Sequence, residues 1–261
     1  MRLAIVSDIH GNLEALEAVL ADLAAQPIDR MICLGDFVGY GASPNECIAR
    51  LRPLIEGAVA GNHDHAAIGR LELGDFNHSA AVAATWTRDA LTPEHRAYLE
   101  SLPYEILLPQ LRLVHASPAE PARWHYVLSP ADADYEMSTY AEPVCLIGHS
   151  HYPGAFEKRI GSAPGPVQSE RAPRDFGTPA GDVRYTRESE LSLRPEARWL
   201  INVGSVGQPR DGDPRAAYLV IDDAECWARH VRVTYDVERA ARRILDAGLP
   251  PFLAQRLSWG E

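Results

Sequence analysis

The sequence predicts an α/β fold in a single domain, and three observations lead to this prediction. Short apolar runs alternate with amphipathic segments from the N-terminus to residue 65, a pattern typical of a parallel sheet covered by helices. Three strand-like runs, RWLINVGSVG, AAYLVID and WARHVRVTY, then follow one another over residues 198–235, which favours an antiparallel second sheet. Apolar residues make up 46% of the 261 residues, enough for a buried core.

The N-terminal part of the chain predicts strands and helices in alternation. Strands or strand ends are expected in RLAIVSD (2–8), RMICLGD (30–36) and GAVAGNHDH (57–65). The leucines of residues 11–26 recur at helical spacing, with Asn12 as a plausible N-cap. Residues 43–54 form the next expected helix, with Ser43 as N-cap and Pro44 at the first helical position.

The rest of the chain predicts further elements of both kinds. Residues 77–101 indicate two helices, the second capped by Thr92, which would form a helical insert over about residues 76–102. The remaining expected elements are strands at 111–117 and 144–151, a helix opened by Ser129 and Pro130, and helices at 236–248 and 251–259. The segment of about residues 156–198 is rich in Gly, Pro and Arg, so we expect a polar surface excursion there. One domain spanning residues 1–261 is the expected organisation.

Composition excludes several classes of protein. The net charge of −11 argues against binding duplex nucleic acid through a general surface field. Phosphate substrates remain compatible, because bound cations supply positive charge locally. The four cysteines show no paired spacing, so neither a disulfide framework nor a thiolate zinc site is expected. The first apolar run is too short for a signal peptide and no run reaches ~20 residues, so we expect a cytoplasmic protein that does not enter membranes; the oligomeric state stays open.

Five apolar runs end in side chains that bind metal ions. These are Asp8 and His10 in IVSDIH, Asp36 in ICLGD, Asn62, His63 and Asp64 in VAGNHD, His115 in LVHA, and His149 and His151 in LIGHSH. Ligands of α/β sheets bind at the carboxyl ends of the strands, so these groups would converge if the strands lie side by side. The alternative is five separate loops with ordinary polar residues. It leaves unexplained why half of the ten histidines follow apolar runs directly.

The types of candidate ligand limit which metal ions could bind. Imidazole, carboxylate and one amide without any thiolate suit manganese, iron, zinc or cobalt. Seven of the groups named above, counted as direct metal ligands, are too many for one tetrahedral ion. They suit two ions, which a carboxylate can bridge. Paired ions ~3.5–4 Å apart serve the hydrolysis of phosphate esters.

The order Asp-x-His, Gly-Asp, Gly-Asn-His-Asp, His and Gly-His-x-His resembles the calcineurin-like metallophosphoesterase superfamily over about residues 1–210. The resemblance implies a two-sheet β-sandwich flanked by helices with two divalent transition-metal ions, manganese preferred. It implies that one ion is held by Asp8, His10 and His151. The other would be held by Asn62, His115 and His149, with Asp36 as the bridge. His63 would be the catalytic residue that assists the leaving group without binding metal.

Local departures refine the resemblance. Protein Ser/Thr phosphatases of the superfamily continue Gly-Asp with Val-Asp-Arg-Gly, whereas this chain has GDFVGYG, so a phosphoprotein phosphatase is not expected. GDFVGYGASPNE and NVGSVGQPRDGDPRAAY resemble a bacterial and archaeal branch of small phosphodiesterases and phosphatases. Some members of that branch hydrolyse dinucleoside polyphosphates.

The expected function is hydrolysis of a small phosphate ester or nucleotide, most simply as a phosphodiesterase in which a metal-bridging hydroxide attacks phosphorus. Phosphomonoesterase and dinucleoside polyphosphate hydrolase are alternatives within enzymes. A non-catalytic scaffold is the alternative from another class, but such a protein would be expected to have lost ligands, and every motif position is filled.

Several further residues have two possible roles each. Arg210, in GSVGQPRDGDP, either binds a substrate phosphate or ties down its own loop through Asp211 or Asp213. Asn12 contacts substrate, caps its helix, or does both. Tyr40 could stack on a base or leaving group, and Trp86 and Trp124 could line a substrate cleft, although a packing role is simpler for all three.

Overall fold

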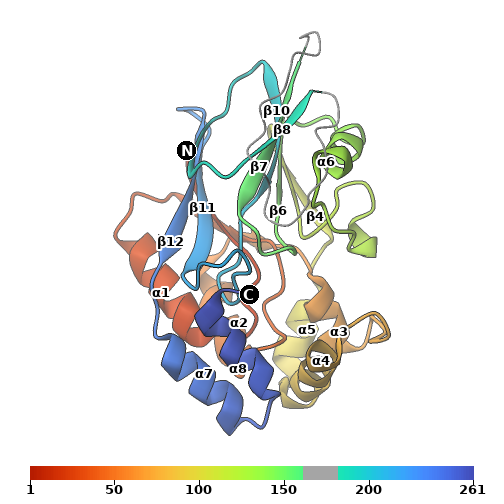
Figure 1. Ribbon diagram of the computed structural model, residues 1–261, viewed down its shortest axis with the longest axis vertical. Helices are drawn as coiled ribbons and strands as arrows, with labels where there is room; N and C mark the ends of the chain where they lie inside the picture. The colour runs from red at the N-terminus through yellow and green to blue at the C-terminus, as the bar shows by residue number, and fades with distance from the viewer. Residues whose placement is uncertain (161–181) are drawn as a thin grey trace.

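The strands form two sheets of six strands that pack face to face (Figure 1), as a computed structural model describing residues 1–160 and 182–261 shows. Helices cover the outer faces of both sheets. The predicted two-sheet sandwich flanked by helices is therefore confirmed.

The first sheet carries the N-terminal strands. Its order is β3 (Gly57–Ala58), β2 (Arg30–Cys33), β1 (Arg2–Val6), β11 (Ala216–Asp222), β12 (Trp227–Val233) and β9 (Glu190–Ser192). Strands β1, β2 and β3 are parallel, whereas β11 joins β1 in antiparallel register and continues antiparallel to β12 and β9. The carboxyl ends of β1, β2 and β3 therefore lie at one edge.

The second sheet has a parallel centre. Its order is β4 (Glu105–Leu108), β5 (Leu111–Val114), β6 (Val144–Ile147), β10 (Ala197–Asn202), β7 (Gly154–Arg159) and β8 (Val183–Thr186). Strands β5, β6 and β10 run parallel to one another. Strands β4 and β7 pair antiparallel to this centre, and β8 pairs antiparallel to β7. The strand ends that precede His115 and His149 are thus neighbours.

The apolar core has layers that follow the alternation of the strands. Leu3 and Ile5 of β1 pack between the sheets, whereas Ala4 and Val6 face the cluster that contains the α1 side chains. Because successive strand residues point to opposite faces, one strand serves two layers of core. This double burial explains why β1 and β11 are apolar at almost every position.

The helices complete the outer layers. They are α1 (Leu13–Ala24), α2 (Pro44–Leu51), α3 (Asn62–Ile68), α4 (His78–Ala90), α5 (Pro93–Glu100), α6 (Pro130–Met137), α7 (Val237–Asp246) and α8 (Pro251–Trp259), with 3₁₀ turns η1 (Arg52–Leu54) and η2 (Pro121–Arg123). The expected caps at Asn12, Thr92 and Ser129 accept backbone hydrogen bonds, but Ser43 makes no side-chain cap. Helix α7 packs against α1, and α8 packs against α7, so the C-terminal helices join the N-terminal part of the fold (Figure 1). None of the helices in residues 1–160 and 182–261 is long and apolar enough to cross a membrane.

The three C-terminal strands do not form the second sheet that the sequence predicted. Strand β10 joins the second sheet beside β6, whereas β11 and β12 extend the first sheet. The connection over residues 203–215 crosses from one sheet to the other, and its Gly207 N–H donates to the Asp8 carbonyl at 2.9 Å. A strand buried on both faces has no alternation of apolar and polar residues that would show which sheet it joins. The prediction therefore put β10 in the same sheet as β11 and β12.

The predicted surface excursion over about residues 156–198 is too wide. Its flanks belong to the sheets, since β7 and β8 pair with each other and β9 pairs with β12. Residues 161–181, which contain most of the Gly- and Pro-rich stretch, lie outside the described residues. Short strands interrupted by charged residues gave no alternation long enough to recognise.

Candidate metal centre

The predicted ligands meet where the two sheets end together. Asp8, His10 and Asp36 follow strands β1 and β2 of the first sheet. His115, His149 and His151 follow β5 and β6 of the second sheet, and Asn62 begins helix α3. The five motifs therefore converge from two facing sheets, not from neighbouring strands of one sheet as the strand-end argument supposed.

The backbone around the ligands is unusual. Five of the predicted ligands have positive φ angles between 50° and 66°, namely Asp8, His10, Asp36, His149 and His151. Residues other than glycine rarely adopt this left-handed region, and such strain gathers at functional sites. These tight turns, and not strand alternation, direct Asp8 and His10 to one point. The same holds for His149 and His151.

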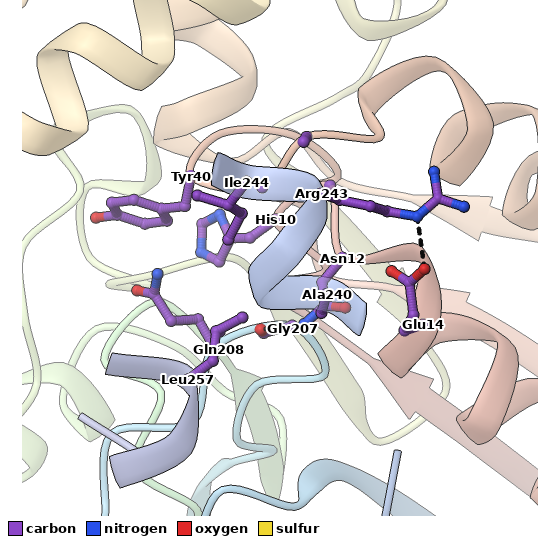
Figure 2. Close-up of a pocket in the computed structure, with 13 residues that line it drawn as sticks. His10, Asn12, Glu14, Tyr40, Gly207, Gln208, Ala240, Arg243, Ile244 and Leu257 are labelled. Atoms are coloured by element: carbon purple, nitrogen blue, oxygen red, sulfur yellow. Dashed lines mark hydrogen bonds and ion pairs between the residues drawn. The ribbon is translucent and has the colours of Figure 1, made fainter. Parts of the chain in front are cut away.

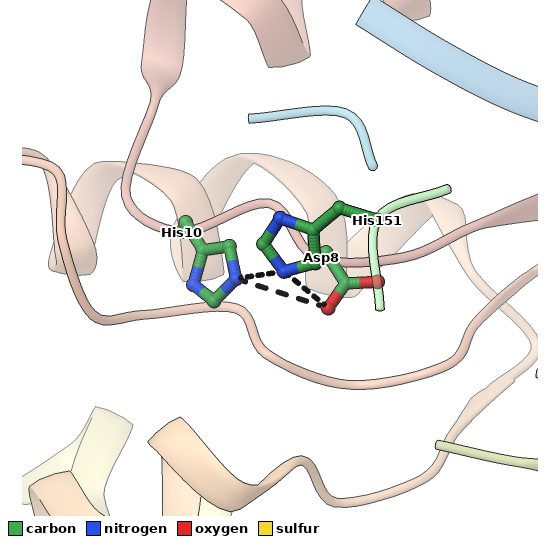
Figure 3. A group of neighbouring side chains, drawn as sticks. All are labelled: Asp8, His10 and His151. Carbon is green, nitrogen blue, oxygen red and sulfur yellow. Dashed lines mark hydrogen bonds and ion pairs between the residues drawn. The ribbon is translucent and has the colours of Figure 1, made fainter. Parts of the chain in front are cut away.

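A first group of ligands joins three of these residues (Figure 3). The Nε2 atoms of His10 and His151 lie 3.0 Å apart. Asp8 Oδ1 lies 3.7 Å from the His10 Nε2 and 3.2 Å from the His151 Nε2. The three atoms form a compact triangle of the kind that holds one cation.

A second group lies beside the first. The Nε2 of His115 lies 3.3 Å from Asp36 Oδ2, 3.2 Å from the side-chain oxygen of Asn62 and 4.0 Å from Asp8 Oδ1. Asp36 Oδ2 also lies 3.6 Å from the Nε2 of His10. The Asp36 carboxylate thus sits between the two groups. The His149 ring is adjacent, with its centroid 5.2 Å from that of His115.

Backbone carbonyls fix the orientation of three imidazoles. The Nδ1 atoms of His10, His115 and His151 donate to the carbonyls of Val38, Leu34 and Gln208, at 3.0, 2.7 and 2.5 Å respectively. A carbonyl only accepts, so the proton of each neutral ring sits on Nδ1 and the Nε2 lone pair faces the centre. This outer support is typical of metal-binding histidines.

Two buried polar atoms of the predicted ligands have no hydrogen-bond partner. They are Oδ2 of Asp36 and Nε2 of His149. Unsatisfied buried acceptors are costly, and a divalent cation would satisfy both. The Nε2 lone pairs of His10 and His151 face each other and also indicate a bound cation. The donor set of imidazole, carboxylate and amide fits two divalent ions.

The charges of the site depend on one another. Burial opposes ionisation of Asp8 and Asp36, but nearby imidazoles outweigh it and lower the pKa of both carboxyls below their usual range. Burial lowers the pKa of His149 to about 3. Burial also acts against charge on His115, yet the Asp36 carboxylate prevails and raises its pKa to about 9.

His63 lies against the first group without joining it. Its ring centroid is 4.9 Å from that of His10 and 4.4 Å from that of Tyr40. Its backbone N–H donates to Asp36 Oδ1 at 2.8 Å, which fixes the start of α3 on the centre. Burial lowers the pKa of His63 to about 4, so the ring is neutral at physiological pH.

Asp64 has a structural task of its own. Its carboxylate accepts from the backbone N–H groups of Asp36, Gly61 and Val38. It thereby holds the loop that follows β2 against the start of α3. The structure shows no contact from the Asp64 carboxylate to the His63 ring.

Two motif glycines are needed for close approach. A Cβ on Gly61 would lie 2.0 Å from Asp36 Oδ1, and one on Gly148 would lie 2.5 Å from Asp8 Oδ2. Each glycine precedes a pair of site residues in its own motif and makes room for the carboxylate of another motif. Spacing alone did not reveal this role.

Arg210 bonds to Tyr40, which lies beside the centre, and to Gln208 of its own loop. Its Nη2 donates to the Tyr40 hydroxyl at 3.2 Å and to Gln208 Oε1 at 3.0 Å. Asp211 instead pairs with Arg187 and Arg232, and Asp213 pairs with Arg215. The interpretation that Arg210 ties down its loop through Asp211 or Asp213 is therefore wrong.

Asn12 supports the loop that carries His10. Its Oδ1 accepts from the Ala15 N–H at 3.1 Å, which is the expected helix cap, and its Nδ2 donates to the Gly207 carbonyl at 2.8 Å. Figure 2 shows Ile244 of α7 and Leu257 of α8 over the same small pocket as His10 and Asn12. The sequence did not predict that the C-terminal helices cover this pocket. The amphipathic pattern of residues 237–246 indicated only that this helix packs against the rest of the protein.

Comparisons with known proteins agree with this geometry. The sequence profile of the calcineurin-like phosphoesterase superfamily domain matches residues 1–224. The uncharacterized protein MJ0912 of Methanocaldococcus jannaschii is 37% identical over 262 residues, covering 99% of this chain and 98% of that protein.

Solved structures show the same fold. A metallophosphoesterase from Sphaerobacter thermophilus superposes with a TM-score of 0.82 at 38% identity, covering 100% of this chain and 99% of that one. The hypothetical protein PH1004 from Pyrococcus horikoshii OT3 shares the fold with a TM-score of 0.74 at 19% identity, covering 100% and 98% of the two chains.

Proposed function

The chain belongs to the calcineurin-like phosphoesterase superfamily, and from this premise we propose that it is a metal-dependent phosphodiesterase. The superfamily uses a dinuclear centre of divalent metal ions and acts on small phosphate esters. The observation that carries the proposal is the convergence of two buried carboxylates and three imidazoles, with the His149 ring beside them. The preference for diesters rests on the motif resemblance of GDFVGYGASPNE.

The proposal assigns seven ligands to two ions. Asp8, His10 and His151 hold the first ion, in keeping with their mutual distances of 3.0–3.7 Å. The second ion is held by Asn62, His115 and His149. Asp36 is the shared ligand, and support comes from its Oδ2, which lies near both groups and has no other partner.

Bound divalent ions, manganese in the first instance and iron, zinc or cobalt as alternatives, would supply Lewis acidity toward the phosphoryl oxygens and an activated water. The chain itself contributes orientation and burial. The carbonyls of Val38, Leu34 and Gln208 keep three imidazoles turned inward, so the donor atoms do not reorganise when a substrate arrives.

His63 is proposed to assist the leaving group. A neutral imidazole keeps one N–H, and the low pKa of His63 makes this form dominant at neutral pH. That N–H would donate to the ester oxygen as the bond to phosphorus breaks, which lowers the cost of its growing negative charge. The Tyr40 ring lies against the His63 ring at a tilt of 48° and limits its movement.

Arg210 is proposed to position the phosphate. A guanidinium forms paired hydrogen bonds to phosphoryl oxygens. The Tyr40 hydroxyl and Gln208 occupy one nitrogen of the fork, and the buried Nε has no partner. Asn12 is a weaker candidate for binding the phosphate, because both of its side-chain polar atoms have partners within the protein.

The decisive experiment compares matched esters on metal-loaded protein. Purified chain with Mn²⁺ is assayed on bis(p-nitrophenyl) phosphate and on p-nitrophenyl phosphate, followed by a panel of nucleotides and dinucleoside polyphosphates. A higher kcat/KM on the diester supports the proposal. A higher value on the monoester or on a dinucleoside polyphosphate supports the alternative hydrolases.

The scaffold alternative needs a separate control. Asp36→Asn is assayed beside the wild type, so that a contaminating phosphatase is recognised by equal rates in both preparations. Hydrolysis that disappears in Asp36→Asn and in chelator belongs to this centre. Two bound ions per chain with no turnover of any ester would favour a non-catalytic protein.

A further inference from the structure

A row of aromatic rings runs along the second group of ligands. The Tyr126 ring stacks on the His149 ring, with centroids 4.1 Å apart and planes inclined by 25°. The Trp124 ring packs edge to face near His115, at 5.9 Å between centroids. Tyr104 extends the row, with its centroid 5.7 Å from that of Trp124. The proposed metal ligands on this side are thus flanked by aromatic side chains.

The outer rings of this row are open to solvent. Tyr126 is 51% exposed and Tyr104 is 41% exposed, whereas His149 is 6% exposed. One face of Tyr126 covers His149, so the exposed area belongs to the rest of the ring. An aliphatic side chain would exclude water from His149 equally well, so covering the imidazole does not by itself require an aromatic residue. Because half of Tyr126 is exposed, its ring is available to a ligand bound at the centre.

The backbone holds Trp124 in an unusual conformation. Its φ is 59°, at the end of the 3₁₀ turn η2. Residues other than glycine seldom adopt this conformation, and it persists where the surrounding structure enforces it. The rings of His65 and Tyr104 enclose the indole, at 5.4 and 5.7 Å between centroids. The indole is thus fixed in place before any ligand binds.

The side of the centre near Tyr40 carries a positive charge, unlike the aromatic side near Tyr126. The guanidinium of Arg210 lies over the Tyr40 ring, 5.6 Å from its centroid. Burial raises the pKa of Tyr40, and the Arg210 guanidinium opposes that shift.

We propose that Tyr126 and Trp124 form a stacking surface beside the metal centre that recognises a planar aromatic group, such as a nucleobase, on the phosphate ester. This inference rests on the proposed function and adds a substrate class to it. Stacking suits planar groups because it uses the ring face and tolerates different substituents. A nucleobase and a simple aryl group share this chemistry, and the experiment separates them.

The test measures binding without turnover. Three phosphonates are titrated calorimetrically into Mn²⁺-loaded full-length protein, namely methylphosphonate, phenylphosphonate and the 5′-phosphonate of 5′-deoxyadenosine. Their carbon–phosphorus bonds resist hydrolysis, so each reports affinity alone. We expect the two aromatic phosphonates to bind the wild type on the order of tenfold more tightly than methylphosphonate, the size of one base stack.

Variants identify the surface responsible. Tyr126→Leu keeps an apolar cover on His149 but removes the flat ring, and it should abolish most of the tenfold preference while the methylphosphonate affinity stays unchanged. Tyr126→Phe should keep the preference. Tyr135, a 62% exposed tyrosine of α6, provides the matched control, and Tyr135→Leu should behave like the wild type. Metal content is measured for each variant.

Each outcome bears on the proposal. Loss of preference for both aromatic ligands in Tyr126→Leu supports recognition of any planar group. Loss for the adenosyl ligand alone supports a nucleobase surface. A wild type without aromatic preference, or a preference unchanged in Tyr126→Leu, overturns the inference. If methylphosphonate itself fails to bind the metal-loaded protein and no ester is hydrolysed, the proposed function fails instead.

Discussion

The Nε2 atoms of His10 and His151 lie 3.0 Å apart, yet neither nitrogen of the neutral rings is able to donate a hydrogen bond to the other. Each ring gives its proton from Nδ1 to a carbonyl, of Val38 and Gln208 respectively. Burial lowers the pKa of both histidines, so neither gains a second proton at neutral pH. Two lone pairs that face each other at this distance repel unless a cation lies between them and the Asp8 carboxylate.

The first prediction follows from that repulsion. Removing metal with a chelator should lower the melting temperature of the wild type, because the facing lone pairs and the two carboxylates lose their compensating charge. At metal concentrations near one hundred times Kd the stabilisation is about 2.7 kcal/mol, which corresponds to roughly 5 °C or more for a chain of this size. Thermal unfolding with EDTA and with excess Mn²⁺ measures the shift.

A matched histidine variant provides the control for this measurement. His78 lies exposed at the start of α4, and His78→Ala should show the full shift. His10→Ala should show a smaller one. Equal melting temperatures of the wild type in EDTA and in Mn²⁺ would contradict the proposed centre.

A second prediction concerns the shared ligand. Asp36→Asn should lose more metal than His10→Ala, because Asp36 Oδ2 lies near both His10 and His115, at 3.6 and 3.3 Å. The substitution is nearly isosteric and keeps an oxygen to accept from the His63 N–H, so folding should survive. Elemental analysis of the desalted variants gives ions per chain. Two ions retained by Asp36→Asn, with activity above that of His10→Ala, would show that Asp36 is not the bridge.

The third prediction separates chemistry from metal binding. His63→Ala should keep two ions per chain, because the contact from α3 to Asp36 comes from the backbone N–H. Its rate should fall by about 10²- to 10³-fold on esters with alkoxide leaving groups, the usual effect of removing one hydrogen-bond donor to a developing negative charge. The rate on nitrophenyl esters should fall less, since nitrophenolate is stable without such a donor. Loss of an ion from this variant would make His63 a ligand.

The fourth prediction is a pH dependence of metal binding. In the metal-free protein the pKa of His115 is raised to about 9 by Asp36, against the effect of burial. A metal ion bound at its Nε2 must displace that proton. Binding should therefore release about one proton per chain at pH 7.5 and almost none well above pH 9. Calorimetry in buffers of different ionisation enthalpy counts the protons.

The stability of the metal-free protein should follow the same group. A histidine whose pKa is higher in the folded state stabilises the fold below its unfolded pKa of about 6.5. That contribution is lost as the pH rises from about 6.5 through 9. A proton release near zero at pH 7.5 would mean that His115 is neutral before metal binds. His63→Ala serves as the control, because it removes an imidazole that is already neutral.

The sequence by itself predicted the candidate metal ligands of this protein. Ligand types, their order and the apolar runs before them are local properties, so Asp8, Asp36 and His115 were identified without coordinates. Helix caps such as Asn12 and Thr92 were identified for the same reason, since a cap depends on residues three positions away.

The tertiary structure decided how those ligands meet. Strands β1 and β6 belong to different sheets, and only the packing of the sheets brings Asp8 to His151. The left-handed turns that aim the ligands, and the space that Gly61 leaves for Asp36, depend on contacts between distant segments. Partners such as Tyr40 for Arg210 likewise lie far apart in the chain. Periodicity reports the burial of a residue, but not which distant residue it will touch.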